Sequence, residues 1–482
     1  MRTYGSASGC ARGYESASEN VSANMRDRRR GGGGGGLPSR AKRRTPLSSI
    51  NPVPAVRVRR RYNRRSSGGG SSVHVLVLGD IGRSPRMTYH ALSIAKHGGR
   101  VNLIGYYETQ PHPDILTNPS ITLTPLPTPP ARPAIIPFIL FAPLKVLFQV
   151  FHLTRLLCYG LSPAEWILVQ NPPSIPTLAV AGLACFLRNT KLMIDWHNYG
   201  WTILAGTRGA GHPLAILSKV YETYVGRLGS HHLTVTHAMA RQLRDAPYRI
   251  KSPLTAVHDR PAEIFQPITS SAVKEEVLGR VIPTPHLVPS ILDGTTRLIV
   301  SSTSWTPDED FSILLDALAQ YASSGSTVPV LAIITGKGPQ KEMYLRKIDQ
   351  LTRAGKLPNV RITTAFLPFE DYAKLLACAD LGICLHMSSS GVDLPMKVVD
   401  MFGAGLPVAA YSGYESFGEL VKEGENGRGF ETAEELAGIL HNLLSEDGTK
   451  ELGLLKKGAV KEGSRRWDEE WDSTVGKIMR LT

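Results

Sequence analysis

The chain has 482 residues and a 42% hydrophobic composition, which is enough for two domains with separate cores. Its formal net charge of +14 suggests a nucleic acid or an anionic membrane as partner, but residues 1–65 alone hold 16 Lys/Arg and 3 Asp/Glu. The remaining chain has 39 basic and 38 acidic residues, so we expect a nearly neutral folded part that binds no nucleic acid.

Residues 1–72 form a basic, Arg- and Gly-rich tail with little to bury, and we predict that this tail is disordered. It is compatible with contact to RNA or acidic lipid and equally with a solvated tail. No apolar run follows its charges, so we do not expect a secretory signal. The five cysteines have no paired spacing, which argues against a zinc or disulfide framework and indicates reduced thiols facing the cytosol.

From residue 73 onward, apolar runs alternate with helical patterns. The run "VHVLVLGD" over 73–80 predicts a buried strand, and the next segment predicts a helix with Ser84 as N-cap and Pro85 at its first position. The strand "RVNLIGYY" completes a βαβ unit. Because the alternation continues through "WILVQNPPS" and "KLMIDWHN", we predict an α/β, Rossmann-like domain over 73–260.

The most apolar segment of the chain is 134–161, which is long enough to span a bilayer but contains Lys145, Gln149 and Arg155. A charge at the bilayer centre costs about 2.5–3.5 kcal/mol. We therefore predict a helix lying in the membrane interface, with a buried core helix and a full span as alternatives. Its immersed side chains would be Phe138, Leu140, Phe141, Leu144, Leu147 and Phe148.

A second domain is predicted after a Pro-rich linker. Residues 261–296 are loosely patterned, and the alternation of strand and helix restarts over 297–482. Two such blocks imply two doubly wound parallel sheets. Ligands of these sheets bind at the carboxyl ends of the strands, so the loops after the strands are where a site is expected.

Two of these loops belong to the first domain. In "GDIGRSPRM", Gly82 and Arg83 precede a helix N-terminus that favours an anion, although a tight turn with solvated arginines is the alternative. The loop lacks the pattern G-x-G-x-x-G, which counts against a dinucleotide dehydrogenase. In "IDWHNYGW", a strand delivers Asp195, His197 and Asn198, where a His could act as general base and an Asp could orient it. Structural polar residues are the alternative there.

The other two loops belong to the second domain. In "TGKGPQKE", Lys337 and Gly338 lie in a turn suited to a phosphate, but the order of a P-loop is missing. In "SSSGVDLPMKVVD", Ser390 and Gly391 precede a helix for which we predict Asp393 as N-cap. Asp393, Lys397 and Asp400 are spaced to share one helix face. An exposed ion-pair face is the alternative, but the helix has few other polar residues, and buried charges need partners.

The stretch "DLPMKVVDMFGAGLPV" resembles the donor-site signature of the GT-B glycosyltransferases, with Asp in place of the more common Glu. Together with "GDIGRSPRM", "IDWHNYGW", "SSTSWTPDEDF" and "TGKGP", it is similar to the branch of that family that adds the first mannose to a dolichol-linked oligosaccharide. This resemblance covers about residues 73–475. It implies two Rossmann-like domains facing a cleft, with the acceptor site in the first and the nucleotide-sugar donor site in the second.

The resemblance also implies a reaction and its partners. The donor would be GDP-mannose, the acceptor dolichol-diphosphate-linked chitobiose, and the transfer would invert the sugar to form a β1,4 bond. The location would be the endoplasmic reticulum membrane with the catalytic domains facing the cytosol. Membrane lipid and other glycosyltransferases of the same pathway are further expected partners. No cofactor is expected, and no metal, since no Asp-x-Asp pair ends a predicted strand.

Roles for single residues follow by the same resemblance. Asp400 would hold the ribose and Asp393 the mannose, while Lys397, Lys337 and the backbone of the loop 388–392 would hold the diphosphate. Gly82, Arg83 and Asn198 would bind the acceptor or a diphosphate from across the cleft. His197 is the candidate base, and Asp195 is the competing choice.

The start of the chain departs from the family, whose members usually carry an apolar anchor before the first strand. Either the segment 134–161 provides all anchoring, or the tail is translated from non-coding sequence, and we expect the second. An alternative function is a non-catalytic GT-B-like membrane subunit that scaffolds other glycosyltransferases. Loss of the donor-site charges would indicate that function, and the charges are present.

Overall fold

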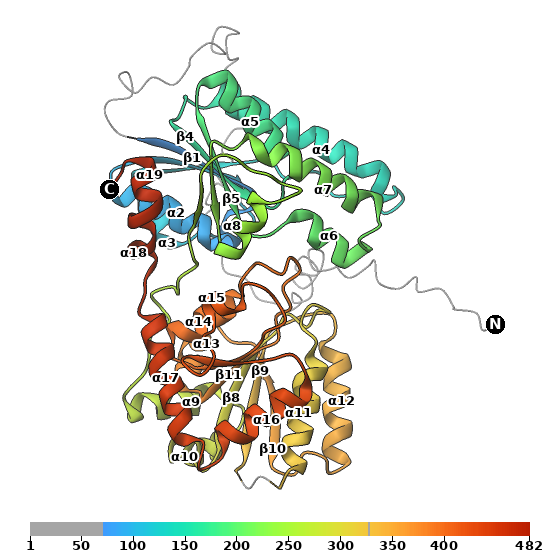
Figure 1. The fold of residues 1–482 in the computed structure, drawn as a ribbon, viewed down its shortest axis with the longest axis vertical. Helices are drawn as coiled ribbons and strands as arrows, with labels where there is room; N and C mark the ends of the chain where they lie inside the picture. The colour runs from blue at the N-terminus through green and yellow to red at the C-terminus, as the bar shows by residue number, and fades with distance from the viewer. Residues whose placement is uncertain (1–70, 326–327) are drawn as a thin grey trace, which may run out of the picture. The chain divides into compact units, whose positions relative to one another are not determined.

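The structure, a computed structural model, describes residues 71–482 except 326–327, so the predicted disordered tail lies outside the described residues apart from its last two positions. The described chain forms two parallel sheets covered by helices (Figure 1). We call the domain built on the first sheet the first domain and the one built on the other sheet the second domain. Both are doubly wound, as the sequence predicts.

The first sheet has the order β3-β2-β1-β4-β5-β6-β7, with every pair of neighbours parallel. Its strands carry runs of apolar residues because both faces are buried. The strands are β1 Ser72–Asp80, β2 Arg100–Tyr106, β3 Ile121–Pro125, β4 Trp166–Asn171, β5 Lys191–Trp196, β6 His231–Thr234 and β7 Leu254–Ala256. The helices between them are α2 Pro85–Lys96, α3 Pro113–Thr117, α4 Phe138–Thr154, η5 Arg155–Gly160, α5 Thr177–Arg188, α6 Gly200–Arg208, α7 Pro213–Val225, η6 Gly226–Leu228 and α8 His237–Arg244.

The second sheet has the order β10-β9-β8-β11-β12-β13 and is also parallel. Its strands are β8 Arg297–Ser302, β9 Val330–Thr335, β10 Val360–Ala365, β11 Leu381–Cys384, β12 Val408–Tyr411 and β13 Gly427–Phe430. Its helices are α9 Ser271–Val281, α10 Val288–Leu292, α11 Phe311–Ser323, α12 Lys341–Arg353, α13 Phe369–Cys378, α14 Met396–Gly403, α15 Phe417–Leu420, α16 Ala433–Leu444 and α17 Thr449–Gly463.

The predicted domain boundaries differ from the structure at two places. The predicted linker 261–296 contains α9 and α10, whose apolar side chains are buried in a core of the second domain with those of α13 and α14. The end of the chain, α18 Trp467–Trp471 and α19 Lys477–Met479, packs into the core of the first domain beside α2. Periodicity predicts that a helix forms but not which sheet covers it, so both errors concern partners rather than helices.

Candidate active site

The centre of the site is Asp195, which is fully buried at the end of β5. Arg86 of α2 donates to both of its oxygens, from Nε at 2.8 Å and from Nη2 at 3.0 Å. Two histidines also contact its Oδ2, His90 through Nε2 at 3.1 Å and His197 through Nε2 at 2.9 Å. Burial alone would raise the pKa of Asp195, but Arg86 and His197 hold it well below the usual value.

This environment separates the two candidates for the base. The Asp195 carboxylate is ionised and already contacts Arg86, His90 and His197, an arrangement suited to orienting a neighbour rather than to taking up a proton. His197 is one quarter exposed, and its Nε2 faces Asp195. A neutral imidazole that donates from Nε2 carries its lone pair on Nδ1. Among the described residues no hydrogen bond occupies that Nδ1, which suits a general base.

Asn198, the next residue, connects the first domain to the second. Its Nδ2 donates to Asp393 Oδ2 at 3.1 Å and to Ser389 Oγ at 3.2 Å. Asp393 Oδ1 accepts from Ser390 Oγ at 3.1 Å and from Ser388 Oγ, while His386 Nε2 lies 3.4 Å from Oδ2. Burial would raise the pKa of Asp393, but His386 and the serines lower it. The prediction that Asp393 caps the following helix is wrong, because α14 begins at Met396 and Pro395 occupies the cap.

Lys397 lies on α14 and pairs with Glu309, a residue that our sequence analysis missed. Glu309 is almost fully buried, and its Oε2 accepts from Ser304 N at 2.6 Å and Thr303 Oγ1 at 2.9 Å. Burial would raise the pKa of Glu309, but the Lys397 ammonium lowers it. The available signal was the run of three carboxylates in "SWTPDED", directly after a predicted strand. The charge of Lys397 is therefore placed by a buried partner.

Lys337 and Gly338 lie beside the same loop. A side chain at Gly338 would place its Cβ 1.7 Å from the Ser304 carbonyl oxygen, so only glycine allows this approach. The ammonium of Lys337 lies 3.6 Å from the ring centroid of Phe366, and the residue is exposed. The loop after β8 carries Glu309, and the loop after β9 carries Lys337 and Gly338. With Lys397, which follows β11, these residues lie at one edge of the second sheet.

Asp400, at the far end of the predicted charged face, has a different environment from Lys397. Burial and the nearby charge of Asp259 raise the pKa of Asp400 to about 8. Asp259 accepts from Arg86 Nη1 at 2.8 Å, so Asp400 lies near the network around Asp195. A neutral carboxyl group can donate a hydrogen bond as well as accept one. The three charges thus do not share one helix face, because Asp393 lies before α14, and their predicted part in a donor site stays a prediction.

Gly82 and Arg83 are held by Asp80 instead of by the site. Asp80 Oδ1 accepts from Gly82 N at 3.3 Å, and Oδ2 accepts from Thr109 Oγ1 at 2.6 Å. A Cβ at Gly82 would lie 2.4 Å from that Thr109 oxygen, which explains the glycine. Arg83 is largely exposed, 3.6 Å from Asp80. Over the described part of the chain, no interaction joins either residue to His197 or Asp393, so their predicted role stays a prediction.

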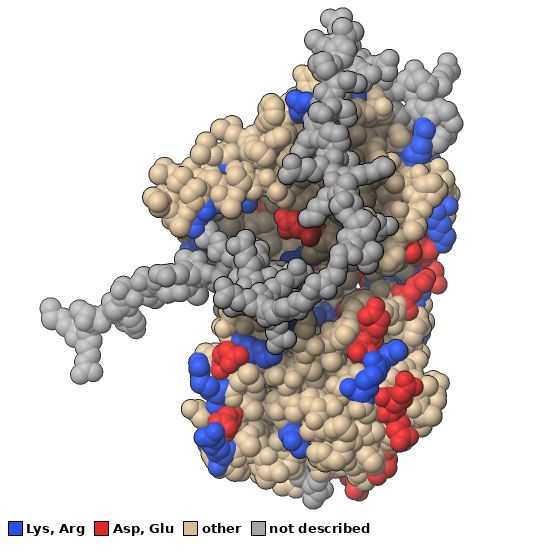
Figure 2. Space-filling model, turned by 180° about the vertical axis from the view of Figure 1, so that it is seen from behind, with Lys and Arg blue, Asp and Glu red and all other residues tan. Residues whose placement is uncertain are grey.

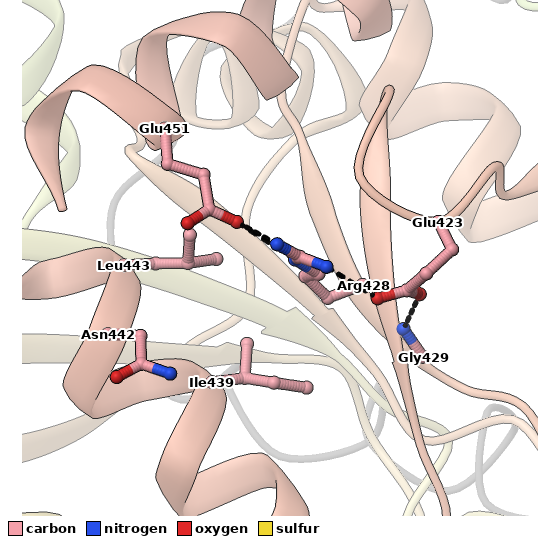
Figure 3. Close-up of a pocket in the computed structure, with 7 residues that line it drawn as sticks. All are labelled: Glu423, Arg428, Gly429, Ile439, Asn442, Leu443 and Glu451. Carbon is pink, nitrogen blue, oxygen red and sulfur yellow. Dashed lines mark hydrogen bonds and ion pairs between the residues drawn. The ribbon is translucent and has the colours of Figure 1, made fainter.

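A pocket of about 230 Å³ lies apart from all these residues, between β13, α16 and α17 (Figure 3). Its one cation, Arg428, is already paired with Glu423 at 3.0 Å and with Glu451. None of the predicted site residues lines it. We therefore assign it no part in the site.

The chain is similar to known glycosyltransferases in sequence and in fold. Residues 295–446 match the model of the family "Glycosyl transferases group 1". The chain is 51% identical to chitobiosyldiphosphodolichol beta-mannosyltransferase of Arthroderma benhamiae, over 78% of this chain and 85% of that protein. It is 41% identical to the Mus musculus protein of the same name, over 85% and 89% of the two chains.

Among solved structures, sucrose-phosphate synthase of Thermosynechococcus elongatus matches with a TM-score of 0.62 and 15% identity, over 85% of this chain and 98% of that one. At this identity the match concerns the fold alone. Together with the two parallel sheets, it shows that the fold is GT-B, as predicted.

Proposed function

Because the chain belongs to the family of chitobiosyldiphosphodolichol beta-mannosyltransferases, we propose that it transfers mannose from GDP-mannose to dolichol-diphosphate-linked chitobiose with inversion. The observation that carries this proposal is the pair of His197 and Asp195 at the end of β5. The next residue, Asn198, donates to Asp393 of the second domain. A single inverting displacement needs one base and a stabilised leaving group. The pair of His197 and Asp195 supports the first, and Lys397 on α14 supports the second.

The proposed step balances as follows. His197 Nδ1 takes the proton of the acceptor hydroxyl while that oxygen forms a bond to C1 of mannose. The bond between C1 and the β-phosphate oxygen breaks on the opposite face, and GDP leaves with the bonding electrons. Asp195 stabilises the imidazolium that forms, because its carboxylate is already ionised.

The leaving diphosphate would be held at the edge of the second sheet. Lys397 is held there by its buried partner Glu309, and the exposed Lys337 lies on the loop after β9. Removing water around these charges would strengthen their interaction with the phosphates. The neutral carboxyl group of Asp400 suits a contact with a sugar hydroxyl.

We further propose that the protein acts at the cytosolic surface of the endoplasmic reticulum membrane, docked by the helices α4, α5 and α7. The helix from Leu140 to Gly160 is long and apolar enough to cross a bilayer, and 22% of it is buried in the protein. Its end is tied to the first domain, since Leu153 and Leu157 are buried and Arg188 donates to the carbonyl oxygen of Leu157. This attachment favours a helix in the interface over a span or a core helix.

Two neighbouring helices extend that apolar surface. α4 packs against α5, and α5 contacts α7 where Ala179 N donates to Tyr221 Oη at 3.1 Å. In Figure 2 the part of the molecule formed by these helices, at the upper left, is almost wholly tan. The outward side chains are Leu140, Leu144, Leu147 and Phe151 of α4, Leu183 and Phe186 of α5, and Ile216, Leu217, Val220 and Tyr224 of α7.

The charges around this surface suit an anionic lipid. From Leu126 to Tyr221 the only carboxylates are Glu165 and Asp195, and both are buried. The exposed charged residues of the three helices are therefore basic, among them Lys145 and Lys219. Apolar immersion combined with cationic attraction is the usual basis of interfacial binding.

The proposed activity is tested by transfer of mannose from labelled GDP-mannose to a lipid-linked chitobiose, with unlabelled nucleotide sugars added as competitors. We expect unlabelled GDP-mannose to suppress the label, and UDP-sugars in the same excess to leave it unchanged. The β linkage of the product, read by NMR coupling at C1 or by β-mannosidase, tests inversion. Suppression by UDP-sugars or an α-linked product would refute the donor or the mechanism.

A further inference from the structure

The end of the chain reaches the network around Asp195. In α18, Trp471 is fully buried, and its indole Nε1 donates to His90 Nδ1 at 2.9 Å. One turn earlier, Trp467 Nε1 donates to Ser93 Oγ at 3.0 Å. Both tryptophans face α2, and the Trp467 ring lies 5.1 Å from the His90 ring and 5.4 Å from the Arg86 guanidinium. Only Trp471, however, donates a hydrogen bond to a partner of Asp195.

The direction of these bonds fixes the proton on His90. An indole N–H is a donor and never an acceptor, so His90 Nδ1 must present its lone pair to Trp471. The proton of the neutral ring then lies on Nε2, which faces Asp195 Oδ2 at 3.1 Å. Both ring nitrogens are thus occupied, and a second proton could bind to Nδ1 only by displacing the indole.

Because His90 is neutral, it does not compete with His197 for an ion pair with the Asp195 carboxylate. The charged and titratable groups facing His90 are Asp195, Arg86 and His197, and Asp259 shares the Arg86 guanidinium. A protonated His90 would pair with Asp195 Oδ2, the same oxygen that holds His197 at 2.9 Å. Burial of His90 lowers its pKa, which acts in the same direction as the indole.

We propose that Trp471 is a positioning residue for the transfer, which holds His90 as its Nε2–H tautomer and so keeps Asp195 Oδ2 oriented toward His197. This inference rests on the proposed function, and it gives α18 a part in a site built by α2 and the end of β5. The relay runs from Trp471 through His90 and Asp195 to His197, over hydrogen bonds of 2.9, 3.1 and 2.9 Å.

The test compares Trp471→Phe with Trp467→Phe in the full chain. Each substitution keeps an aromatic ring and removes one buried indole N–H, so Trp467→Phe controls for lost stability. We expect Trp471→Phe to lower kcat roughly 10- to 100-fold, as a misplaced reacting group does, with the KM for GDP-mannose unchanged. Trp467→Phe should keep kcat within about twofold of the wild type, because the lost hydrogen bond ends at Ser93 and the phenylalanine keeps a ring beside His90 and Arg86. Equal losses of kcat in the two variants would overturn the proposal.

A second measurement does not depend on mannose transfer. NMR spectra of the protein labelled with 15N-histidine distinguish the two tautomers of His90 in the wild type. We expect the Nε2–H form alone from pH 6 to pH 8, and a mixture or a titrating ring in Trp471→Phe. A proton on Nδ1 in the wild type would refute the relay. If the tautomer is as expected but no mannose is transferred, the relay stands and the proposed function fails.

Discussion

Asn198 of the first domain donates to Asp393 of the second, with Nδ2 and Oδ2 3.1 Å apart. Asn198 directly follows His197, so one contact links the candidate base to the loop that precedes α14. A second contact lies beside it, where Thr236 Oγ1 donates to the carbonyl oxygen of Val392 at 2.6 Å. Val392 itself is buried in the core of the first domain. The loop before α14 is therefore fixed on the first domain.

The contact predicts the effect of Asn198→Asp. A second carboxylate would replace the amide donor opposite Asp393, and two like charges at this distance repel each other. We expect kcat/KM to fall about 10- to 100-fold because the reacting groups lose their alignment. Steady-state kinetics at saturating acceptor measure this. Asn198→Ala removes the bond without adding charge and should lose less, so a larger loss in the alanine variant would contradict the argument.

His197 is predicted to be the base, and His197→Ala should lower kcat at least about 100-fold, the usual contribution of a general base. A matched control is His231→Ala on the neighbouring strand β6, where His231 Nε2 contacts Thr255 Oγ1 at 3.2 Å. The control should retain most of the wild-type turnover. Comparable turnover in the two variants would remove His197 from the mechanism.

The pair of Lys397 and Glu309 predicts that stability and nucleotide binding can be separated. Lys397→Met leaves the buried Glu309 carboxylate without its cation, which should lower the free energy of unfolding by about 2–3 kcal/mol, since Lys397 is partly exposed and its pairing partly screened. Adding Glu309→Gln should restore most of that stability but not the affinity for GDP. Urea unfolding and calorimetric titration with GDP measure the two effects. Normal GDP affinity in Lys397→Met would exclude this lysine from the donor site.

The sequence alone predicted both parallel sheets, because strand runs such as that of β1 are mostly apolar and alternate with helical patterns. The sequence also predicted which polar residues gather at the strand ends, because the carboxyl ends of parallel strands meet at one edge of a sheet. Asp195, His197 and Asn198 were found by that rule, and so was Asp393.

Contacts between residues far apart in the sequence could not be predicted. Glu309 meets Lys397 over 88 positions, and Trp471 meets His90 over 381, distances at which a periodic pattern carries no information. The helix face expected for Asp393, Lys397 and Asp400 failed for a local reason. Ser388, Ser390 and His386 hold the Asp393 carboxylate in the loop, so α14 starts after it.

The proposed membrane surface predicts that α4 and α7 contribute alike. Immersing one leucine stabilises binding by about 1.5–3 kcal/mol, so Leu144→Glu and Leu217→Glu should each weaken binding to vesicles at least about tenfold. Val273→Glu on α9 replaces a similarly exposed apolar side chain of the second domain and serves as control. Co-sedimentation with vesicles containing phosphatidylserine measures the binding. Unchanged binding of Leu217→Glu would restrict the surface to α4.

His258 predicts a dependence of stability on pH. Its Nε2 and Nδ1 each lie 3.2 Å from a carboxylate, of Glu419 and Glu470 respectively. Although burial alone would lower the pKa of His258, hydrogen bonds to these carboxylates raise it to about 9. A raised pKa stabilises the fold fully below the unfolded value of about 6.5, and the gain is lost as the pH rises through about 9. For the carboxylates the sign is opposite: hydrogen bonds to His258 lower the pKa of both, so their contribution is lost in acid.

We therefore expect the free energy of unfolding to fall by about 2–3 kcal/mol between pH 6 and pH 10, and this fall to be absent in His258→Gln. Urea unfolding across that range measures it.

An alternative reading of this cluster is a metal site, because His237, His258 and Glu419 offer ligand atoms within 4.8 Å of one another. A bound metal would make the unfolding midpoint rise with added Zn²⁺ and fall with a chelator. If the unfolding midpoint responds to Zn²⁺ but not to alkaline pH, the cluster is a metal site rather than a set of ion pairs.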